Sequence, residues 1–442
     1  MSRLNEIVRK LTPEKSIRVY HRMRDSIQNS VTFMTMRYKF DRLKYWLIEN
    51  RIRIFKKGKR INVVFLVIGK QAWKYEELYR LMASKPERYN LIILVCPIVN
   101  KGRENMLERL SDAYDYFSGK YNNVYLSYDN EKDKYLELTT FHPDVVLHTN
   151  PYKGLIDDRY YINNVRNALT CYLTYGADIC SGDWCYALEL HQRVWRQFIS
   201  TNGDVEYVKK YCPWAVSNRV VTGYPMYEIL TGGTNVPKDW KNPDPKYKRI
   251  IWAPHHTIEG NRGLLSLSTF LQYADYILEL TEKYKDRCQF VFKPHPLLRY
   301  NLEHHPNWGK GRTDAYYAKW ERGENTNYVN GDYIDLFNSS DAMMHDCGSF
   351  LQEYLYTQKP VMYLSNAFNE EEFNYMGIDM YNAYYKAFSK EDIVKFIEDV
   401  VVKGNDPMRA DRVSVFDKYL LPPNGRTASE NILYEIEKII GT

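Results

Sequence analysis

Alternation between short apolar segments and amphipathic helical patterns constrains this chain more than any other feature. The strand-like runs and the helical patterns between them fall at 61–69, 75–83, 90–97, 104–117, 145–150 and 168–176. Apolar strands separated by helices are typical of a parallel sheet that is covered on both faces. The sequence therefore predicts an α/β fold for this part of the chain.

The same alternation begins again after 231–248, a stretch rich in Gly, Pro and Lys that has the composition of a linker. Its strand-like runs and helical patterns fall at 249–254, 265–283, 288–296, 327–330, 341–346, from Ser349 onward and at 360–364. A chain of 442 residues is too long for one ordinary core. We therefore expect two doubly wound α/β domains with a cleft between them.

Basic residues are concentrated at the start of the chain. The first 60 residues carry 17 Lys and Arg against 5 Asp and Glu, and the remainder carries 44 against 50. Apolar residues fall near helical spacing among these charges, namely Phe33, Met36, Phe40, Leu43, Leu47, Ile52 and Phe55. This pattern is typical of a helix on an anionic membrane surface, and a helix docked on the protein's own core shows it too. These first 60 residues carry no motif typical of nucleic-acid binding, so no nucleic-acid partner is expected.

Other segments narrow the class of protein further. The seven cysteines include no Cys-x-x-Cys pair, which indicates neither a disulfide framework nor a zinc site. The first residues lack the apolar core of a signal peptide, and no run of about 18 apolar residues follows. The sequence therefore predicts a cytoplasmic protein whose membrane contact is peripheral.

Three strands of the second series end in residues suited to phosphate chemistry. His255 and His256 follow the run at 249–254, and Lys293 and His295 close the run at 288–296. Such side chains can neutralise charge that develops on a leaving phosphate. One histidine alone is often a core or surface residue, but three strand ends of this kind in one domain favour a site.

The third strand end leads through a small polar turn into a helix. Gly348 permits close approach of a ligand to the backbone, and Ser349 offers a hydroxyl and helix N–H groups to a pyrophosphate. Glu353 lies one turn further on the same face, where its carboxylate can accept both ribose hydroxyls. The alternative for Glu353 is an ordinary exposed helix residue.

These residues together resemble the CDP-glycerol glycerophosphotransferase family, which contains teichoic-acid and capsule polymerases. The resemblance rests on Pro-His at 254–255, Lys-Pro-His-Pro at 293–296, the Asp346-Cys347-Gly348-Ser349 turn with Glu353, and the closing stretch at 425–433. It covers roughly residues 240–440. The resemblance implies a GT-B fold, in which the second of two Rossmann-like domains binds the donor, and it implies action at the inner face of the cell membrane.

The resemblance also implies a division of the chain. We expect a basic helical segment at 1–60, an acceptor domain at 61–235, a nucleotide-donor domain at 236–405, and C-terminal helices at 406–442 that pack back toward the acceptor domain. The implied reaction transfers glycerol phosphate or ribitol phosphate from a CDP-activated donor to a lipid-linked or glycan acceptor, with release of CMP. The expected catalytic histidines are His255, His256 and His295. The expected substrate- or nucleotide-binding residues are Lys293, Asp346, Gly348, Ser349, Glu353, Tyr175 and Gly176.

The first domain departs from the family's pattern. Tyr175-Gly176 stands where the family carries a His-Gly pair, and a tyrosine is a poor base at neutral pH because its pKa is near 10. Asp178, His191 and His256 are alternative candidates for the catalytic base. No Asp-x-Asp motif stands near the strand ends, so neither a metal nor another cofactor is expected.

Two other functions remain open at this stage. A glycosyltransferase that uses a UDP-linked sugar would have the same fold and would use Glu353 in the same way. A catalytically inactive relative would bind a nucleotide without turning it over, and the Tyr175-Gly176 pair is the feature that favours it.

Overall fold

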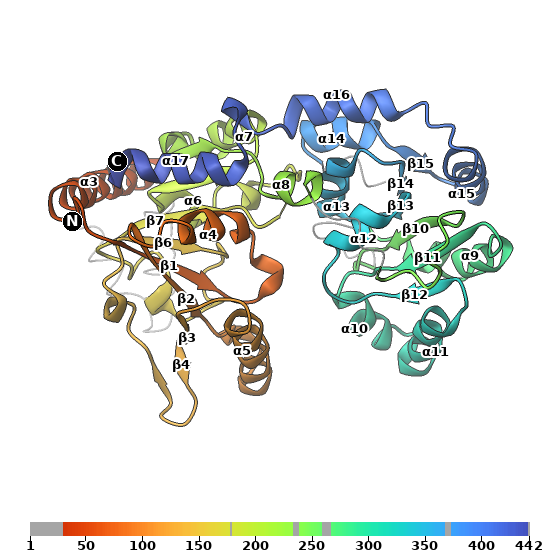
Figure 1. The fold of residues 1–442 in the computed structure, drawn as a ribbon, viewed down its shortest axis with the longest axis horizontal. Helices are drawn as coiled ribbons and strands as arrows, with labels where there is room; N and C mark the ends of the chain where they lie inside the picture. Colours follow the sequence, from red (N-terminus) through yellow and green to blue (C-terminus); the bar gives the residue numbers. More distant parts are fainter. Residues whose placement is uncertain (1–29, 177–178, 233–237, 259–266, 367–372, 441–442) are drawn as a thin grey trace, which may run out of the picture.

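Two parallel sheets organise the chain. The computed structural model describes residues 30–176, 179–232, 238–258, 267–366 and 373–440. Within these residues the two sheets form neighbouring domains, the N-terminal domain coloured from red to green and the C-terminal domain from green to blue (Figure 1). The predicted pair of Rossmann-like sheets, preceded by a helical segment, is confirmed.

The N-terminal sheet has the strand order β3-β2-β1-β6-β7-β8-β9, and all its pairings are parallel. Its strands are β1 (Ile61–Val67), β2 (Tyr89–Val95), β3 (Val124–Leu126), β6 (Val145–His148), β7 (Leu169–Leu173), β8 (Arg196–Ile199) and β9 (Arg219–Val221). A small antiparallel hairpin, β4 (Tyr128–Asp129) with β5 (Lys134–Tyr135), follows β3. The sequence missed β3, β8 and β9 because they are short and two of them begin with arginine.

The C-terminal sheet has the strand order β12-β11-β10-β13-β14-β15, again entirely parallel. Its strands are β10 (Lys248–Ala253), β11 (Cys288–Phe292), β12 (Thr326–Tyr328), β13 (Ala342–His345), β14 (Val361–Leu364) and β15 (Tyr385–Ala387). The order reverses between β10 and β13. In sheets of this kind, ligands bind beyond the carboxyl ends of the strands at that reversal.

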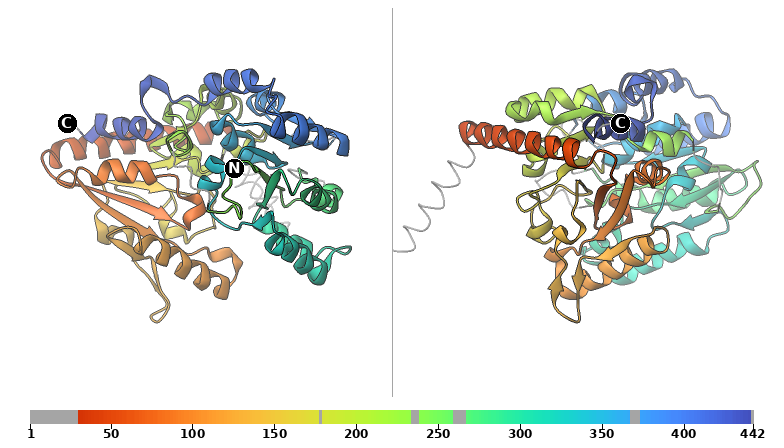
Figure 2. Two further views of the ribbon diagram at one scale, coloured as in Figure 1. Left: turned by 45° about the vertical axis from the view of Figure 1, so that its right-hand side comes forward. Right: turned by 60° about the vertical axis from the view of Figure 1, so that its left-hand side comes forward.

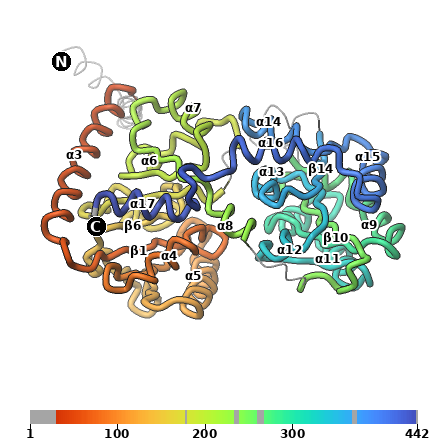
Figure 3. Tube along the Cα trace, turned by 45° about the horizontal axis from the view of Figure 1, so that its top comes forward, coloured from red at the N-terminus to blue at the C-terminus, as the bar shows by residue number. Residues whose placement is uncertain are grey.

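Helices cover both domains. They are α3 (Val31–Phe55), α4 (Glu76–Ala83), α5 (Arg103–Ser118), α6 (Glu189–Arg193), α7 (Asn202–Tyr211), α8 (Met226–Thr231), α9 (Phe270–Lys283), α10 (Leu297–Glu303), α11 (Gly309–Arg322), α12 (Ile334–Ser339), α13 (Gly348–Glu353), α14 (Tyr375–Asn382), α15 (Lys390–Lys395), α16 (Arg409–Tyr419) and α17 (Ala428–Ile440). The chain passes from α16, which packs beside α14, to α17, which packs on α4 and α3 (Figure 3). The C-terminal segment therefore contacts both domains.

Backbone contacts also join the two domains. Cys180 and Phe373 form an antiparallel bridge, and the Asn374 N–H donates to the Ile179 carbonyl at 2.8 Å. One apolar core cluster contains side chains from both halves, including Ile179 and Met226 with Leu351 and Phe373. The domains are thus packed together through the segment around Ile179.

Helix α3 has two contrasting faces. Tyr38, Asp41, Tyr45, Ile48 and Ile52 are buried against the rest of the N-terminal domain. The opposite face exposes most of the stripe noted in the sequence, with Met36, Phe40, Leu43, Leu47 and Phe55 between 55% and 69% exposed. Figure 2 shows this helix, in red, along the edge of the molecule. The sequence missed the docking face because a buried aspartate and two tyrosines contribute to it.

The described residues include no helix with the length and apolarity needed to cross a membrane. Residues 1–29, which form the first half of the predicted basic segment, lie outside the described part of the chain.

Candidate functional site

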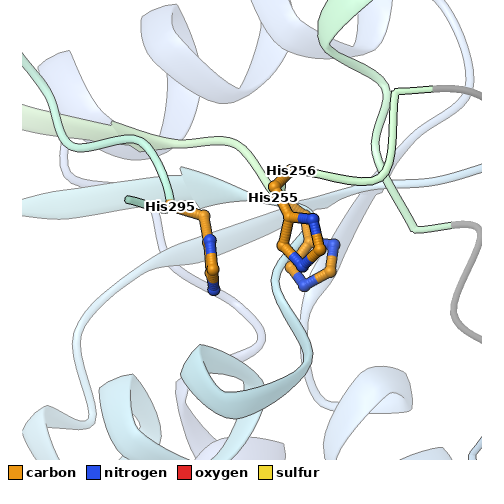
Figure 4. A group of neighbouring side chains, drawn as sticks. All are labelled: His255, His256 and His295. Atoms are coloured by element: carbon orange, nitrogen blue, oxygen red, sulfur yellow. The ribbon is translucent and has the colours of Figure 1, made fainter. Parts of the chain in front are cut away.

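The predicted histidines gather where β10 and β11 end. His255, His256 and His295 have ring centroids 4.3 Å to 5.3 Å apart, and the imidazoles lie beside one another (Figure 4). His255 follows β10, and Asp346 follows β13, so this cluster stands at the reversal of strand order. The geometry therefore places these side chains where a doubly wound sheet binds its ligand.

Asp346 holds the end of β10 in place. Its buried carboxylate accepts hydrogen bonds from the backbone N–H of His255 at 2.5 Å and from both the N–H and the hydroxyl of Thr269, at 2.6 Å and 2.8 Å. Burial raises the pKa of Asp346 to about 6. The sequence assigned Asp346 to ligand binding, whereas the structure directs its carboxylate to protein groups that position His255.

Hydrogen bonds fix which nitrogen carries the proton in two of the three imidazoles. The Leu297 backbone N–H donates to His295 Nδ1 at 3.2 Å. Asn301 Nδ2, which donates to the His256 carbonyl at 2.8 Å, also lies 3.4 Å from His256 Nδ1 and can only donate there. In the neutral form both rings therefore carry the hydrogen on Nε2, and Nε2 is a donor.

Burial holds the three histidines of the cluster neutral. Burial lowers the pKa of His255 to about 2 and that of His295 to about 3, with further contributions from neighbouring histidines and, for His295, from Lys293. Burial also lowers the pKa of His256. The three rings together with Lys293 form a set of hydrogen-bonding groups that suits an anion.

Lys293 is the buried cation of this site. It is 4% exposed, and burial lowers its pKa. Among the residues that the structure describes, its ammonium group forms no hydrogen bond or ion pair. Asp332 attracts this ammonium group without forming an ion pair with it. A cation with little compensation in a mostly buried position favours a negatively charged ligand.

The same histidines can be considered as metal ligands, because one ligand atom from each lies within 4.8 Å of the others. A neutral imidazole with hydrogen on Nε2 and an N–H donor bonded to Nδ1 has no nitrogen lone pair left for a metal ion. The hydrogen bonds to His256 and His295 therefore favour an anion at this cluster. That no metal is required stays a prediction.

The predicted turn begins α13. Its first residues are Gly348, which is half-buried, and Ser349, which is exposed. A Cβ atom on Gly348 would lie 3.6 Å from Leu267 and 3.9 Å from Ile179 of the N-terminal domain. The start of this helix therefore faces the segment that joins the two domains.

Glu353 lies at the end of α13 and is 3% exposed. Its Oε2 accepts from the Tyr333 hydroxyl at 2.5 Å. Its Oε1 accepts from the Tyr224 hydroxyl at 3.2 Å and lies 3.7 Å from Lys74 Nζ. The carboxylate thus links the domains, and the sequence alternative of an exposed helix residue is wrong.

The N-terminal candidates lie around this carboxylate or away from it. Tyr175 is half-buried, its hydroxyl lies 2.9 Å from that of Tyr152, and its carbonyl accepts from Tyr224 at 2.9 Å. Gly176 follows it, and Asp178 lies outside the described residues. His191 is 3% exposed and stacks on Tyr172, so it is a core residue rather than an accessible base.

Sequence reasoning missed Lys74, Tyr224 and Tyr333. Lys74 lies between β1 and α4, beyond the carboxyl end of a strand of the N-terminal sheet. In the sequence, this kind of position was singled out mainly in the C-terminal domain. Attention to strand ends in both domains would have found Lys74. Nothing local marks the two tyrosines, because their contact with Glu353 depends on how the domains pack.

The arrangement of two Rossmann-like sheets is that of the GT-B fold. Comparison with models of protein families and with curated proteins gives no match. Among solved structures, the wall teichoic acid polymerase TagF is similar with a TM-score of 0.55 and 13% identity over 92% of this chain and 98% of that chain. A putative UDP-N-acetylglucosamine 2-epimerase from Listeria monocytogenes is similar with a TM-score of 0.51 and 17% identity over 86% and 96%. The structure of S. aureus MnaA with UDP is similar with a TM-score of 0.50 and 14% identity over 85% of this chain and 96% of that chain. These likenesses show the fold.

Proposed function

We propose that this chain transfers a polyol phosphate, either glycerol phosphate or ribitol phosphate, from a CDP-activated donor to a glycan or lipid-linked acceptor and releases CMP. The observation that carries the proposal is that the buried side chain of Lys293 occurs at the same strand ends as the Nε2–H groups of His256 and His295. Such a set of donors fits the phosphates of an activated donor. The family resemblance of these strand ends and the likeness to TagF support the choice of donor.

In the proposed reaction, an acceptor hydroxyl oxygen attacks the β-phosphorus of the donor in line. The new oxygen–phosphorus bond forms as the bond from that phosphorus to the bridging oxygen breaks, and the electron pair leaves with CMP. Transfer of this kind depends mainly on positioning and charge neutralisation, which Lys293 and the histidines supply. Because His256 Nε2 is a donor in this arrangement, His256 is not assigned as the base for the acceptor proton; Asp178, the other candidate from the sequence, lies outside the described residues.

A UDP-linked sugar donor is the second candidate. The observation that favours it is the likeness to a UDP-N-acetylglucosamine 2-epimerase and to MnaA with UDP. The histidine cluster with Lys293 fits either donor, because both donors contain a diphosphate whose oxygens accept hydrogen bonds.

Thermal-shift measurements with CDP-glycerol, CDP-ribitol, UDP-N-acetylglucosamine, CDP and UDP separate the candidates. A ligand at 100 times its dissociation constant stabilises the folded state by about 2.7 kcal/mol. Selective stabilisation by cytidine compounds, followed by CMP release from the donor that binds, supports polyol phosphate transfer. Preference for uridine compounds supports a sugar transferase, and binding without turnover supports an inactive relative.

We also propose that the exposed face of α3 lies on an anionic membrane surface, where a lipid-linked acceptor would be found. Helix α3 carries two acidic residues, and both face the protein: Asp41 pairs with Arg193 at 2.9 Å, and Glu49 accepts from Trp195 Nε1 at 2.6 Å. Apart from Thr32, the exposed residues of α3 are therefore apolar or basic. A symmetric dimer through this face would bring like charges together, so anionic lipid is the better occupant.

Vesicle co-sedimentation of the full chain tests this surface. Replacing Leu43 and Leu47 by Glu should greatly reduce binding to phosphatidylglycerol vesicles, whereas Leu271→Glu, at an exposed leucine of α9, should leave it unchanged. Equal binding of both variants would contradict the proposal. A change of oligomeric state in the α3 variant would assign the face to a second copy of the chain.

A further inference from the structure

The two oxygens of Glu353 are held unequally. Tyr333, from the same domain, donates to Oε2 at 2.5 Å. Oε1 has the two longer contacts, 3.2 Å to the Tyr224 hydroxyl and 3.7 Å to Lys74 Nζ, and both partners belong to the N-terminal domain. Oε1 is therefore the oxygen whose partners depend on the packing of the two domains.

Both partners of Oε1 also contact other groups. The Tyr224 hydroxyl has one hydrogen and two acceptors, because it lies 2.9 Å from the Tyr175 carbonyl as well. The Lys74 ammonium has three hydrogens, and its contacts are the Tyr333 hydroxyl at 3.1 Å, Met226 Sδ at 3.7 Å and Glu353. Both groups can leave Oε1 and still keep a hydrogen-bonding partner.

A buried carboxylate that loses these partners needs others, because an uncompensated buried charge is strongly unfavourable. A ribose diol supplies two O–H donors, which matches the number of partners that Oε1 would give up. We propose that Lys74 and Tyr224 occupy Glu353 in the unloaded protein and are exchanged for ribose hydroxyls when a nucleotide donor binds. This proposal rests on the proposed function, since it requires a nucleotide ligand.

The exchange couples donor binding to the relative position of the domains. Lys74 lies on the loop after β1, and Tyr333 follows β12 in the C-terminal domain, so the contact ties one strand-end loop to another. Release of Oε1 removes the Lys74–Glu353 and Tyr224–Glu353 contacts between the domains, while the Lys74–Tyr333 contact stays. Lys74 and Tyr224 are therefore positioning residues that oppose donor binding, whereas Glu353 favours it.

Titration calorimetry with CDP and with UDP tests the exchange on the full chain. Lys74→Met should raise the affinity about fivefold to tenfold, because the nucleotide no longer competes with the ammonium group. Tyr224→Phe removes one hydroxyl with little change of shape and should act in the same direction, which keeps the test valid if Lys74→Met folds poorly. Glu353→Gln should lower the affinity about tenfold. Lys70→Met, an exposed lysine in the same loop, is the matched control and should leave it unchanged.

Opposite signs for the Lys74 and Glu353 variants distinguish an exchange from a permanent ion pair. If both substitutions lower the affinity, or if Lys74→Met and Tyr224→Phe equal the Lys70 control, the exchange is wrong while the proposed function stands. If the wild-type chain binds neither nucleotide, the proposed function and the exchange fail together.

Discussion

Histidines follow or neighbour strands in both domains, but they have different surroundings. In the N-terminal domain, His148 ends β6, is 1% exposed and has no hydrogen-bond partner for either ring nitrogen among the described residues. In the C-terminal domain, His255, His256 and His295 come from two strand ends and lie within ring contact of one another. Burial lowers the pKa of His148 to about 4, much as it does in the C-terminal cluster.

A lowered pKa therefore does not distinguish a site from a core. The difference is that the C-terminal histidines come together from two strand ends and have defined hydrogen bonds. His256 and His295 have N–H donors at Nδ1, which leaves their hydrogen on Nε2, and Lys293 is close enough to His295 to affect its pKa. His148 has neither feature. The comparison teaches that the C-terminal domain holds a prepared anion site, whereas the buried histidines of the N-terminal domain contribute to packing.

The largest expected effect comes from His295→Ala. Loss of one preorganised donor to the transferred phosphate should lower turnover about 10²- to 10³-fold, with the fold intact by circular dichroism. His304→Ala, at an exposed histidine that follows α10, is the matched control. Full activity of the His295 variant in a CMP-release assay would remove this residue from the mechanism.

Lys293→Met should separate binding from stability. Removing the cation should weaken CDP binding about 30-fold, yet it should raise the melting temperature of the empty protein, because the buried charge has no partner there. Calorimetry and thermal melting measure the two changes. A variant that is both less stable and unchanged in CDP binding would assign Lys293 a structural role.

The pH dependence of stability sharpens the comparison further. A histidine whose pKa is lowered on folding makes the unfolded state bind more protons, so stability falls as the pH drops below about 6.5. Each such group contributes up to about 1.4 kcal/mol per pH unit once the pH is well below 6.5, until its folded pKa is reached, which is about 3 for His295. Between pH 7 and pH 5, denaturant unfolding should show a shallower slope in His295→Asn, with a loss of stability smaller by about 2 kcal/mol over this range. An unchanged slope would contradict the neutral state.

The smallest effect is expected in the N-terminal domain. His148→Leu replaces an imidazole without partners by an apolar side chain of similar size, which should change CDP affinity and turnover by less than about twofold. A large loss of turnover in the same CMP-release assay would show that this buried histidine has a catalytic function, and the contrast between the domains would then be wrong.

Local patterns predicted the fold and the C-terminal cluster because each depends on short segments. Apolar runs mark β1, β2, β10 and β11, and polar residues at their ends mark His255 and His295. The contacts of Glu353 were beyond prediction, since Lys74 and Tyr224 come from the other domain. The docking face of α3 was also missed, because it includes the charged residue Asp41, whose partner Arg193 is far away in the sequence.

The central claim is that the strand ends of the C-terminal domain bind the phosphates of a nucleotide-activated donor. Calorimetric titration of CDP into the wild-type chain and into the Lys293→Met and His295→Ala variants tests it most directly. CDP should bind the wild-type chain, and each variant should bind it more weakly because each lacks one group that holds a phosphate. Absence of binding by both CDP and UDP, or CDP binding that is unchanged in both variants, would contradict the claim.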